Sequence, residues 1–104
     1  MDTYYFAYGH NTEKRTMLQR IPEARLVGTA VLPKHRLVLR EFADVVKERK
    51  HQNQSDVLGV LWKMPKASLT KLDRIELFYS RKLKWVSFQS KMGESLGVLY
   101  EQAH

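Results

Sequence analysis

The sequence predicts an α+β domain, a small mixed β-barrel of about six strands with two short helices. Short runs rich in Val, Leu and aromatic residues alternate with turn signals along most of the chain. One run, residues 57–62, is apolar on both strand faces apart from a glycine, which is typical of a strand covered on both sides. Only two segments have helical spacing. Together these observations favour a small barrel over an open sheet.

The start of the chain predicts a buried strand followed by a short helix. Residues 4–8 are aromatic or apolar throughout, which indicates a strand inside the domain. Behind them, Asn11 is placed to cap a helix that carries Met17 and Leu18. Pro22 cannot continue that helix, so we expect the helix to end before it.

Three further strands are predicted before the middle of the chain. Residues 24–32 and 36–40 carry Val and Leu, and Pro33 between them indicates a turn. Residues 42–46 continue as the third strand. The next segment, residues 47–55, has no apolar residue and no periodicity, so we expect a solvated loop.

A second helix is predicted where Pro65 follows the strand at 57–62. Leu69, Leu72 and Ile75 recur at three-residue spacing and form one apolar stripe that can pack on the sheet. Glu76 then falls in the last turn of this helix or just beyond it.

The end of the chain predicts two strands, residues 81–88 and 96–100, joined by a glycine hairpin at 91–94. The sequence contains no internal repeat. A length of 104 residues is that of one domain, so we expect a single domain over residues 1–104.

The composition excludes several classes of protein. Absence of cysteine rules out disulfides, thiolate nucleophiles and cysteine-based metal sites, and it fits a reducing compartment, so we expect a cytoplasmic protein. No apolar run approaches the roughly 18 residues of a membrane helix, so no membrane partner is expected. His35, His51 and His104 lie far apart in the sequence, which argues against a metal site.

The charge is strongly basic. Eighteen Lys and Arg against eleven Asp and Glu give a net charge of +7, which favours anionic ligands through long-range attraction. Small acidic molecules, nucleic acid and anionic lipid all fit this sign.

The first strand breaks into a polar glycine turn, Tyr8-Gly9-His10-Asn11. Glycine allows a positive φ or a close approach of ligand to backbone, and successive N–H groups in such a turn attract anions. An ordinary strand-to-turn ending is the alternative interpretation of this segment.

These residues and several later motifs resemble the γ-glutamylcyclotransferase family in its broad AIG2-like and BtrG-like sense. The family has a Tyr-Gly-Ser-Asn loop after its first strand, and five further elements match in the same order. They read Arg20-Ile21-Pro22-Glu23-Ala24, His35-Arg36-Leu37, Ala43-Asp44-Val45, Gly59-Val60-Leu61-Trp62 and Leu72-Asp73-Arg74-Ile75-Glu76.

The resemblance implies an enzyme that cyclises a γ-glutamyl amine, amino acid or peptide to 5-oxoproline and releases the amine, with no cofactor. It implies Glu76 as the catalytic base, and a substrate held by the loop residues Tyr8, Gly9, His10 and Asn11. Tyr79 is the nearest match to a family tyrosine that closes the pocket, and a core position is its alternative. Asp73 and Arg81 also match family positions, but we expect them to form a structural ion pair.

A glutamate base must have a raised pKa to do this work. With an ordinary pKa of about 4.3 against about 7.8 for an α-amine, the proton transfer is uphill by about 5 kcal/mol. Partial burial beside Phe78 and Tyr79, at a helix C-terminus whose dipole disfavours a carboxylate, would raise the pKa of Glu76. A surface glutamate at a helix end is the alternative.

Two departures from the family pattern support a second hypothesis. His10 replaces the loop serine, and Leu77 replaces the glycine that usually follows the glutamate. In the second hypothesis the pocket is impaired, and the fold is a basic binding module whose loop, with Lys47, Arg49 and Lys50, contacts nucleic acid or an acidic protein. Basic residues are scattered and no RNA-binding or helix-turn-helix motif appears, so the sequence favours the enzyme.

Overall fold

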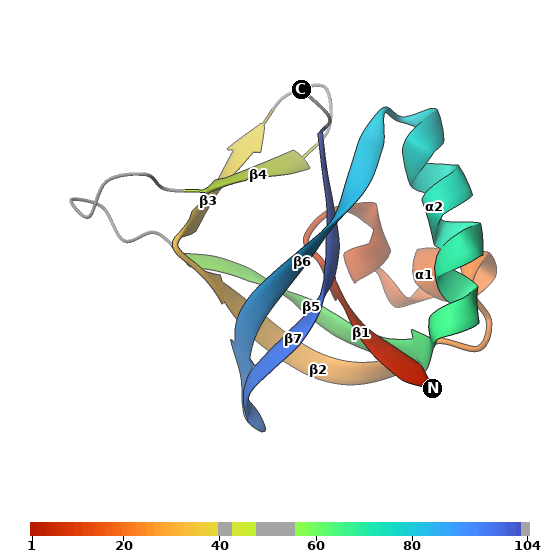
Figure 1. Ribbon diagram of the computed structural model, residues 1–104, viewed down its shortest axis with the longest axis horizontal. Helices are drawn as coiled ribbons and strands as arrows, with labels where there is room; N and C mark the ends of the chain where they lie inside the picture. Colours follow the sequence, from red (N-terminus) through yellow and green to blue (C-terminus); the bar gives the residue numbers. More distant parts are fainter. Residues whose placement is uncertain (40–42, 48–55, 103–104) are drawn as a thin grey trace.

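The computed structural model describes residues 1–39, 43–47 and 56–102. Five strands form a closed barrel, and two further strands form a small second sheet beside it (Figure 1). The barrel order is β1 (Asp2–Ala7), β5 (Asp56–Pro65), β2 (Arg25–Pro33), β6 (Arg81–Ser90) and β7 (Gly93–Gln102). The second sheet pairs β3 (His35–Leu39) with β4 (Ala43–Lys47).

The barrel is mixed because it closes through one parallel pair. β1 lies antiparallel to β5 on one side and parallel to β7 on the other, where Tyr5 is opposite Val98. The predicted fold class is therefore confirmed, although the described residues form seven strands where about six were expected.

The strands near Pro33 do not form the simple pair that their order suggests. The turn residue is Lys34, which has φ of 62°, and Pro33 is the last residue of β2. β2 pairs with β5 and β6, whereas β3 pairs with β4. Chain direction reverses at the predicted place, but the second strand enters another sheet. Arg40, Phe42 and residues 48–55 of the predicted loop lie outside the described residues.

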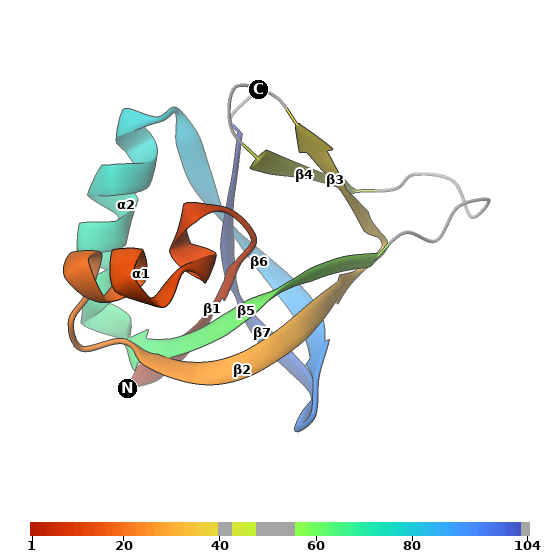
Figure 2. The same cartoon turned by 180° about the vertical axis from the view of Figure 1, so that it is seen from behind.

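The two described helices lie on the same side of the barrel (Figure 2). A 3-10 turn, η1 (His10–Thr12), leads into α1 (Lys14–Arg20), and a second, η2 (Lys66–Ser68), leads into α2 (Leu69–Phe78). Helix α1 ends before Pro22 as expected, with Met17 fully buried. The predicted capping role of Asn11 is wrong, because Glu13 occupies the N-cap position and no side chain caps the helix.

The core has two parts, and adjacent residues of β5 serve both of them. Trp62 packs with Met17, Leu72 and Val98, whereas Leu61 packs with Phe6, Phe88 and Leu99. Coverage of both faces of this strand is thus confirmed at residues 61 and 62. At Leu58 it is wrong, since that side chain is 71% exposed.

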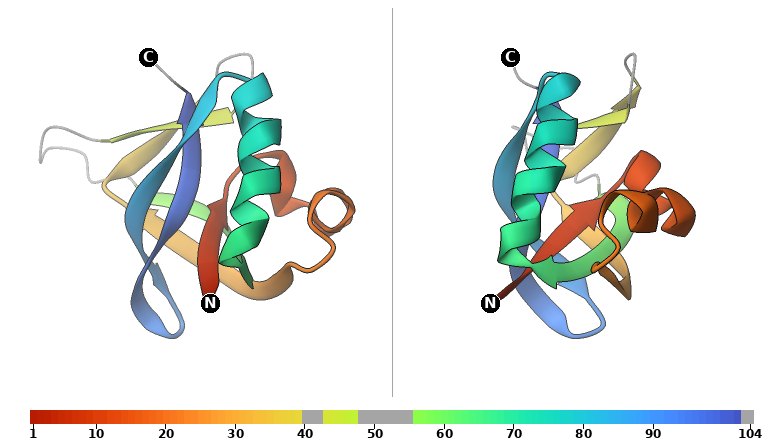
Figure 3. Two further views of the ribbon diagram at one scale, coloured as in Figure 1. Left: turned by 45° about the vertical axis from the view of Figure 1, so that its right-hand side comes forward. Right: turned by 90° about the vertical axis from the view of Figure 1, so that its right-hand side faces the viewer.

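Helix α2 runs beside the barrel and leads directly into β6 (Figure 3). Leu69 and Leu72 are buried as predicted, and Ile75 is half-buried. The next fully buried position after Leu72 is Glu76 in the last turn, which is only 3% exposed. The helix therefore turns a carboxylate inward where an apolar residue would continue the stripe.

The last two strands form a tight hairpin as expected, and both are longer than predicted. β6 and β7 pair from Arg81 with Gln102 to Ser90 with Gly93, which leaves two residues in the turn. Gly93 has φ of 97°, a conformation that glycine adopts without strain. Neither described helix has the length and apolar character that a membrane-spanning helix requires.

Gly59 marks a place where two barrel strands approach too closely for a side chain. A Cβ atom there would lie 2.5 Å from the Ala7 carbonyl oxygen and 2.5 Å from the Phe6 ring. We expect Gly59→Ala to lower the free energy of unfolding by about 1–3 kcal/mol, measured by urea denaturation. Leu58→Ala, at the exposed neighbouring position, is the control and should change it by less than about 0.5 kcal/mol. Equal free energies of unfolding for the two variants would show that β1 and β5 can move apart at residue 59 without loss of stability.

Candidate active site

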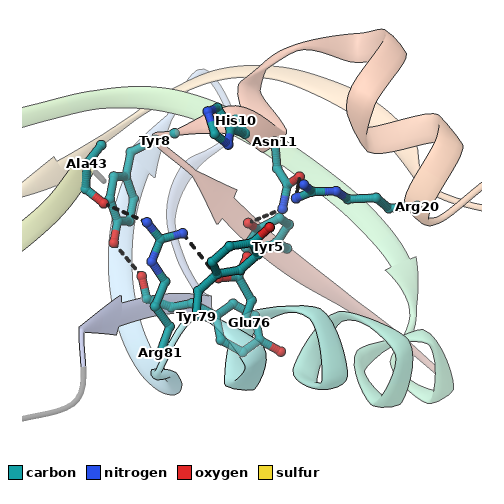
Figure 4. A pocket seen from close by; sticks show the side chains of 11 residues that line it. Tyr5, Tyr8, His10, Asn11, Arg20, Ala43, Glu76, Tyr79 and Arg81 are labelled. Atoms are coloured by element: carbon teal, nitrogen blue, oxygen red, sulfur yellow. Dashed lines mark hydrogen bonds and ion pairs between the residues drawn. The ribbon is translucent and has the colours of Figure 1, made fainter. Parts of the chain in front are cut away.

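A pocket of about 450 Å³, counted out to its open mouth, lies where the loop after β1, the end of α2 and the start of β6 meet (Figure 4). The first strand contributes the back of the pocket, α2 contributes a carboxylate, and the second sheet contributes one wall. The lining residues are Tyr5, Tyr8, Gly9, His10, Asn11, Arg20, Ala43, Glu76, Tyr79, Arg81 and Tyr100.

The carboxylate of Glu76 is the buried acid of this pocket. Burial raises its pKa, and the positive charges of Arg81, Arg20 and His10 act in the opposite direction without cancelling the effect. Phe78, which we expected to shield the carboxylate, is 82% exposed, so that expectation is wrong. Burial comes instead from the pocket walls, because a residue two positions along a helix points away from Glu76.

Arg81 connects Glu76 to the second sheet. Its Nη1 atom lies 3.3 Å from Glu76 Oε2, and its Nη2 atom donates to the Ala43 carbonyl oxygen at 3.3 Å. The expected ion pair between Asp73 and Arg81 is wrong, since Asp73 accepts a hydrogen bond from the Tyr100 hydroxyl. Arg81 is therefore part of the pocket.

Gly9 does not use the left-handed conformation that glycine permits. Its φ is −122°, and its carbonyl oxygen accepts hydrogen bonds from the amide and the hydroxyl of Thr12. A Cβ atom at Gly9 would lie 3.9 Å from the Ala43 Cβ, which is ordinary contact. The positive-φ prediction is wrong here. Close approach of a ligand remains a prediction for this glycine.

Asn11 is a buried connector between the loop, α1 and β1. Arg20 Nη1 donates to Asn11 Oδ1 at 2.7 Å, and Asn11 Nδ2 donates to the Tyr5 hydroxyl at 3.0 Å. Trp62 Nε1 donates to the Asn11 carbonyl oxygen at 2.9 Å. These contacts fix the loop against the barrel, which explains why the side chain is turned inward and does not cap α1.

Two tyrosines that line the pocket, Tyr8 and Tyr100, are joined to each other and to α2 by hydrogen bonds. The Tyr8 hydroxyl donates to the Tyr100 carbonyl oxygen, and the Tyr100 hydroxyl donates to Asp73. Burial raises the pKa of both phenols well above the usual value, so both remain protonated over the physiological range.

The two departures from the family pattern do not block the pocket. His10 is exposed and lies at the rim, while Leu77 is 63% exposed and is not among the lining residues. Tyr79 is 38% exposed and lines the pocket, so it is not a core aromatic.

All six residues predicted for the site line this pocket, and their roles stay predictions. Sequence patterns missed five others, which are Tyr5, Arg20, Ala43, Arg81 and Tyr100. Arg20 and Ala43 belong to matched motifs and Arg81 matches a family position near Glu76, so these positions were the available signal. Tyr5 and Tyr100 read as strand aromatics, which gave no signal of a pocket.

No group of three potential metal ligands occurs among residues 1–39, 43–47 and 56–102. His35 is buried between the Pro33 carbonyl oxygen and Lys84 Nζ, at 2.9 Å and 3.3 Å. It therefore has a structural role at the edge of the second sheet. His51 and His104 lie outside the described part of the chain.

Loss of Arg81 should raise the pKa of Glu76 further. Both the charge of Arg81 and its hydrogen bond lower this pKa, so Arg81→Met leaves only the effect of burial and two more distant cations. We therefore expect the pKa of Glu76 to rise further in this variant, measured by 13C NMR titration of the glutamate carboxyl carbons. Lys71→Met is the control, because that exposed cation pairs with Glu23 at 3.2 Å. An unchanged pKa in Arg81→Met would show that the guanidinium charge does not act on Glu76.

The fold recurs in several solved structures. A protein described as "Gamma-glutamyl cyclotransferase" aligns with a TM-score of 0.84 at 23% identity, over 100% of this chain and 68% of that protein. An uncharacterized protein from Homo sapiens aligns with a TM-score of 0.82 at 24% identity, over 99% and 68%. An AIG2-like protein from Mus musculus aligns with a TM-score of 0.77 at 15% identity, over 98% and 78%. At these identities the likeness establishes the fold alone.

Among curated protein sequences there is no significant match to this chain. The family itself is identified from the sequence profile, which matches residues 5–103 and so covers the loop, the buried glutamate and all of the barrel strands except the first three residues of β1. The chain belongs to the family described as gamma-glutamyl cyclotransferase, AIG2-like.

Proposed function

We propose that the protein is a γ-glutamylcyclotransferase-like lyase that converts a γ-glutamyl amine, amino acid or peptide to 5-oxoproline and the free amine. One observation carries the proposal. Glu76 is a buried carboxylate with a raised pKa, and it lies in the same pocket as the Tyr8 to Asn11 loop. A carboxylate that is buried in a pocket, where its ionised form loses hydration, is typical of a general base.

In the proposed reaction the substrate attacks itself. The α-ammonium group loses a proton to Glu76, and its nitrogen then bonds to the γ-carbonyl carbon. The bond from that carbon to the leaving nitrogen breaks as Glu76 returns the proton to that nitrogen, and the ring nitrogen then loses its second proton, which the released amine takes up as an ammonium ion. Atoms balance without water or a cofactor.

Because the attack is intramolecular, the pocket needs only to hold the substrate curled. Well-oriented intramolecular reactions reach effective molarities of roughly 10⁵ M or more. The raised pKa of Glu76 reduces the uphill step of about 3.5 units that an ordinary glutamate would meet with an α-amine. Arg81 limits that rise, and so favours the ionised form, which can accept a proton.

The charges of the pocket fit an acidic substrate. Arg20 and Arg81 both line it, against the single carboxylate of Glu76, so the pocket carries an excess of positive charge. A γ-glutamyl group brings an α-carboxylate that this charge attracts. Backbone N–H groups of Gly9, His10 and Asn11 are the proposed donors to its polar atoms.

The binding-module hypothesis loses support at the pocket. It rested in part on an impaired pocket, yet Leu77 does not line the pocket and His10 is exposed at its rim. Lys47 of the proposed contact loop is exposed, and Arg49 and Lys50 lie outside the described residues, so the contact with nucleic acid or an acidic protein stays a prediction.

Replacing Glu76 should abolish turnover without unfolding the protein. Glu76→Gln keeps the shape and removes the base, so we expect turnover to fall by at least about 10²-fold. Mass spectrometry would measure 5-oxoproline after incubation with a panel of γ-glutamyl compounds. The melting temperature should stay nearly the same, because the ionised carboxylate is itself penalised by burial.

Glu94→Gln is the matched control for this variant. Glu94 is an exposed acid that accepts from Ser87 at the far hairpin, so its loss should leave turnover intact. Full activity in Glu76→Gln would remove Glu76 from the mechanism.

The exposed histidine at the rim should be dispensable. His10→Ser restores the serine of the family loop, and if the loop acts through its backbone we expect kcat/KM to stay within about threefold or to rise. Steady-state assays with the best γ-glutamyl substrate would measure it. Complete loss of activity would instead place the imidazole in the chemistry.

A further inference from the structure

Three buried or half-buried tyrosines line the pocket, and they differ in where their hydroxyl protons go. The Tyr8 hydroxyl donates to the Tyr100 carbonyl oxygen, and the Tyr100 hydroxyl donates to the Asp73 carboxylate. The Tyr5 hydroxyl accepts a hydrogen bond from Asn11. Among the described residues, no protein acceptor receives the Tyr5 proton.

The direction of the Tyr5 contact is fixed by Arg20. A guanidinium group can only donate, so the Asn11 atom at 2.7 Å from Arg20 Nη1 must be the amide oxygen. The amide nitrogen therefore faces the Tyr5 hydroxyl at 3.0 Å, and it too can only donate. Tyr5 must accept from Asn11, which leaves its own O–H free to donate into the pocket.

The position of Tyr5 suits a donor to a reacting group. The residue is 4% exposed on β1, and its ring meets the Tyr100 ring edge-on with centroids 6.0 Å apart, so the phenol is held rigidly. Burial and the nearby Glu76 charge raise its pKa well above the usual value. The hydroxyl thus stays protonated beside the proposed base.

We infer that the Tyr5 hydroxyl is a catalytic hydrogen-bond donor to the γ-carbonyl oxygen of the substrate, and that Arg20 and Asn11 are positioning residues that aim it. The inference rests on the proposed function. Figure 4 shows the chain of contacts from Arg20 through Asn11 to Tyr5, on the pocket side that faces Glu76.

Tyr5 would stabilise the negative charge that develops on the γ-carbonyl oxygen, without giving up its own proton. When the α-amine nitrogen bonds to the γ-carbonyl carbon, the electron pair of the C=O π bond moves to oxygen, where Tyr5 donates a hydrogen bond. When the intermediate collapses, that pair re-forms the carbonyl and the leaving nitrogen departs with the proton held by Glu76. Tyr5 keeps its proton throughout the reaction. Its hydroxyl would supplement the backbone N–H groups of the loop as a donor to the oxyanion.

The decisive variant is Tyr5→Phe, which keeps the ring and removes the donor. A hydrogen bond that strengthens only as the oxyanion forms acts on kcat more than on KM. We expect kcat to fall by about 10²-fold, with KM changed by less than about threefold. Tyr4→Phe is the matched control, since Tyr4 packs edge-on against Phe88 and does not line the pocket, and both kinetic constants should stay unchanged.

The pH profile separates action on the substrate from action on the base. If Tyr5 donates to the γ-carbonyl oxygen, the acid limb of kcat/KM, which reports Glu76 in the free enzyme, keeps its midpoint in Tyr5→Phe. A shift of that midpoint toward higher pH, with the plateau value of kcat retained, would overturn the inference and make Tyr5 a partner of Glu76.

Arg20 provides the independent variant should Tyr5→Phe fail to fold. Arg20→Met releases the Asn11 amide, so we expect kcat to fall by about tenfold, and Arg20→Lys, which can still donate to Asn11 Oδ1, should recover most of it. Equal kcat for Arg20→Met and the unchanged protein would overturn the inference that Arg20, through Asn11, orients the Tyr5 hydroxyl.

The same assays distinguish failure of the proposed function from failure of the proposed role of Tyr5. Absence of 5-oxoproline from every γ-glutamyl compound with the unchanged protein overturns the proposed function, and the role of Tyr5 with it. Production of 5-oxoproline by the unchanged protein, with the same kcat in Tyr5→Phe, overturns the role of Tyr5 alone.

Discussion

The contact between Glu76 and Arg81 is the interaction on which the site depends. Removing a carboxylate from water is costly, and it is tolerated here because a half-buried guanidinium lies 3.3 Å away. The same arginine donates to the Ala43 carbonyl oxygen and so ties α2, β6 and the second sheet together. Burial and attraction oppose each other, and because burial prevails the pKa of Glu76 is raised.

Closure of the barrel brings the parts of the pocket together. The parallel contact of Tyr5 with Val98 places β1 beside β7, so that Tyr8 at the end of β1 reaches the Tyr100 carbonyl oxygen. Two glycines allow this packing. A Cβ atom at Gly59 would overlap Ala7 and Phe6, and one at Gly97 would lie 2.7 Å from Phe88 and 2.8 Å from the Tyr4 carbonyl oxygen.

The polar contacts of the pocket also use a side chain that could otherwise cap helix α1. Asn11 has the side chain of a helix cap, yet its amide is used by Arg20 and Tyr5, and α1 begins without a side-chain cap. Missing a cap costs a helix about 1 kcal/mol, a cost that burial of Met17 in the core can offset. The loop is thus shaped by the pocket more than by the helix that follows it.

The sequence by itself determined the fold class, the family and the order of the elements, because these follow from local periodicity and from motifs that are contiguous in the chain. Residues 57–62 and the hairpin at 91–94 were recognisable for this reason. Glu76 and the Tyr8 to Asn11 loop were also proposed from motifs, and the pocket includes all of them.

Only the tertiary structure decided which side chains meet. Arg81 pairs with Glu76 and not with Asp73, Phe78 faces outward, and β3 leaves the barrel to pair with β4, none of which local spacing can specify. The tertiary structure likewise decides which acceptor each tyrosine hydroxyl donates to, since the hydrogen bonds of Tyr8 and Tyr100 join residues 92 and 27 positions apart. Long-range hydrogen bonds depend on barrel closure, and closure brings together strands from opposite ends of the chain.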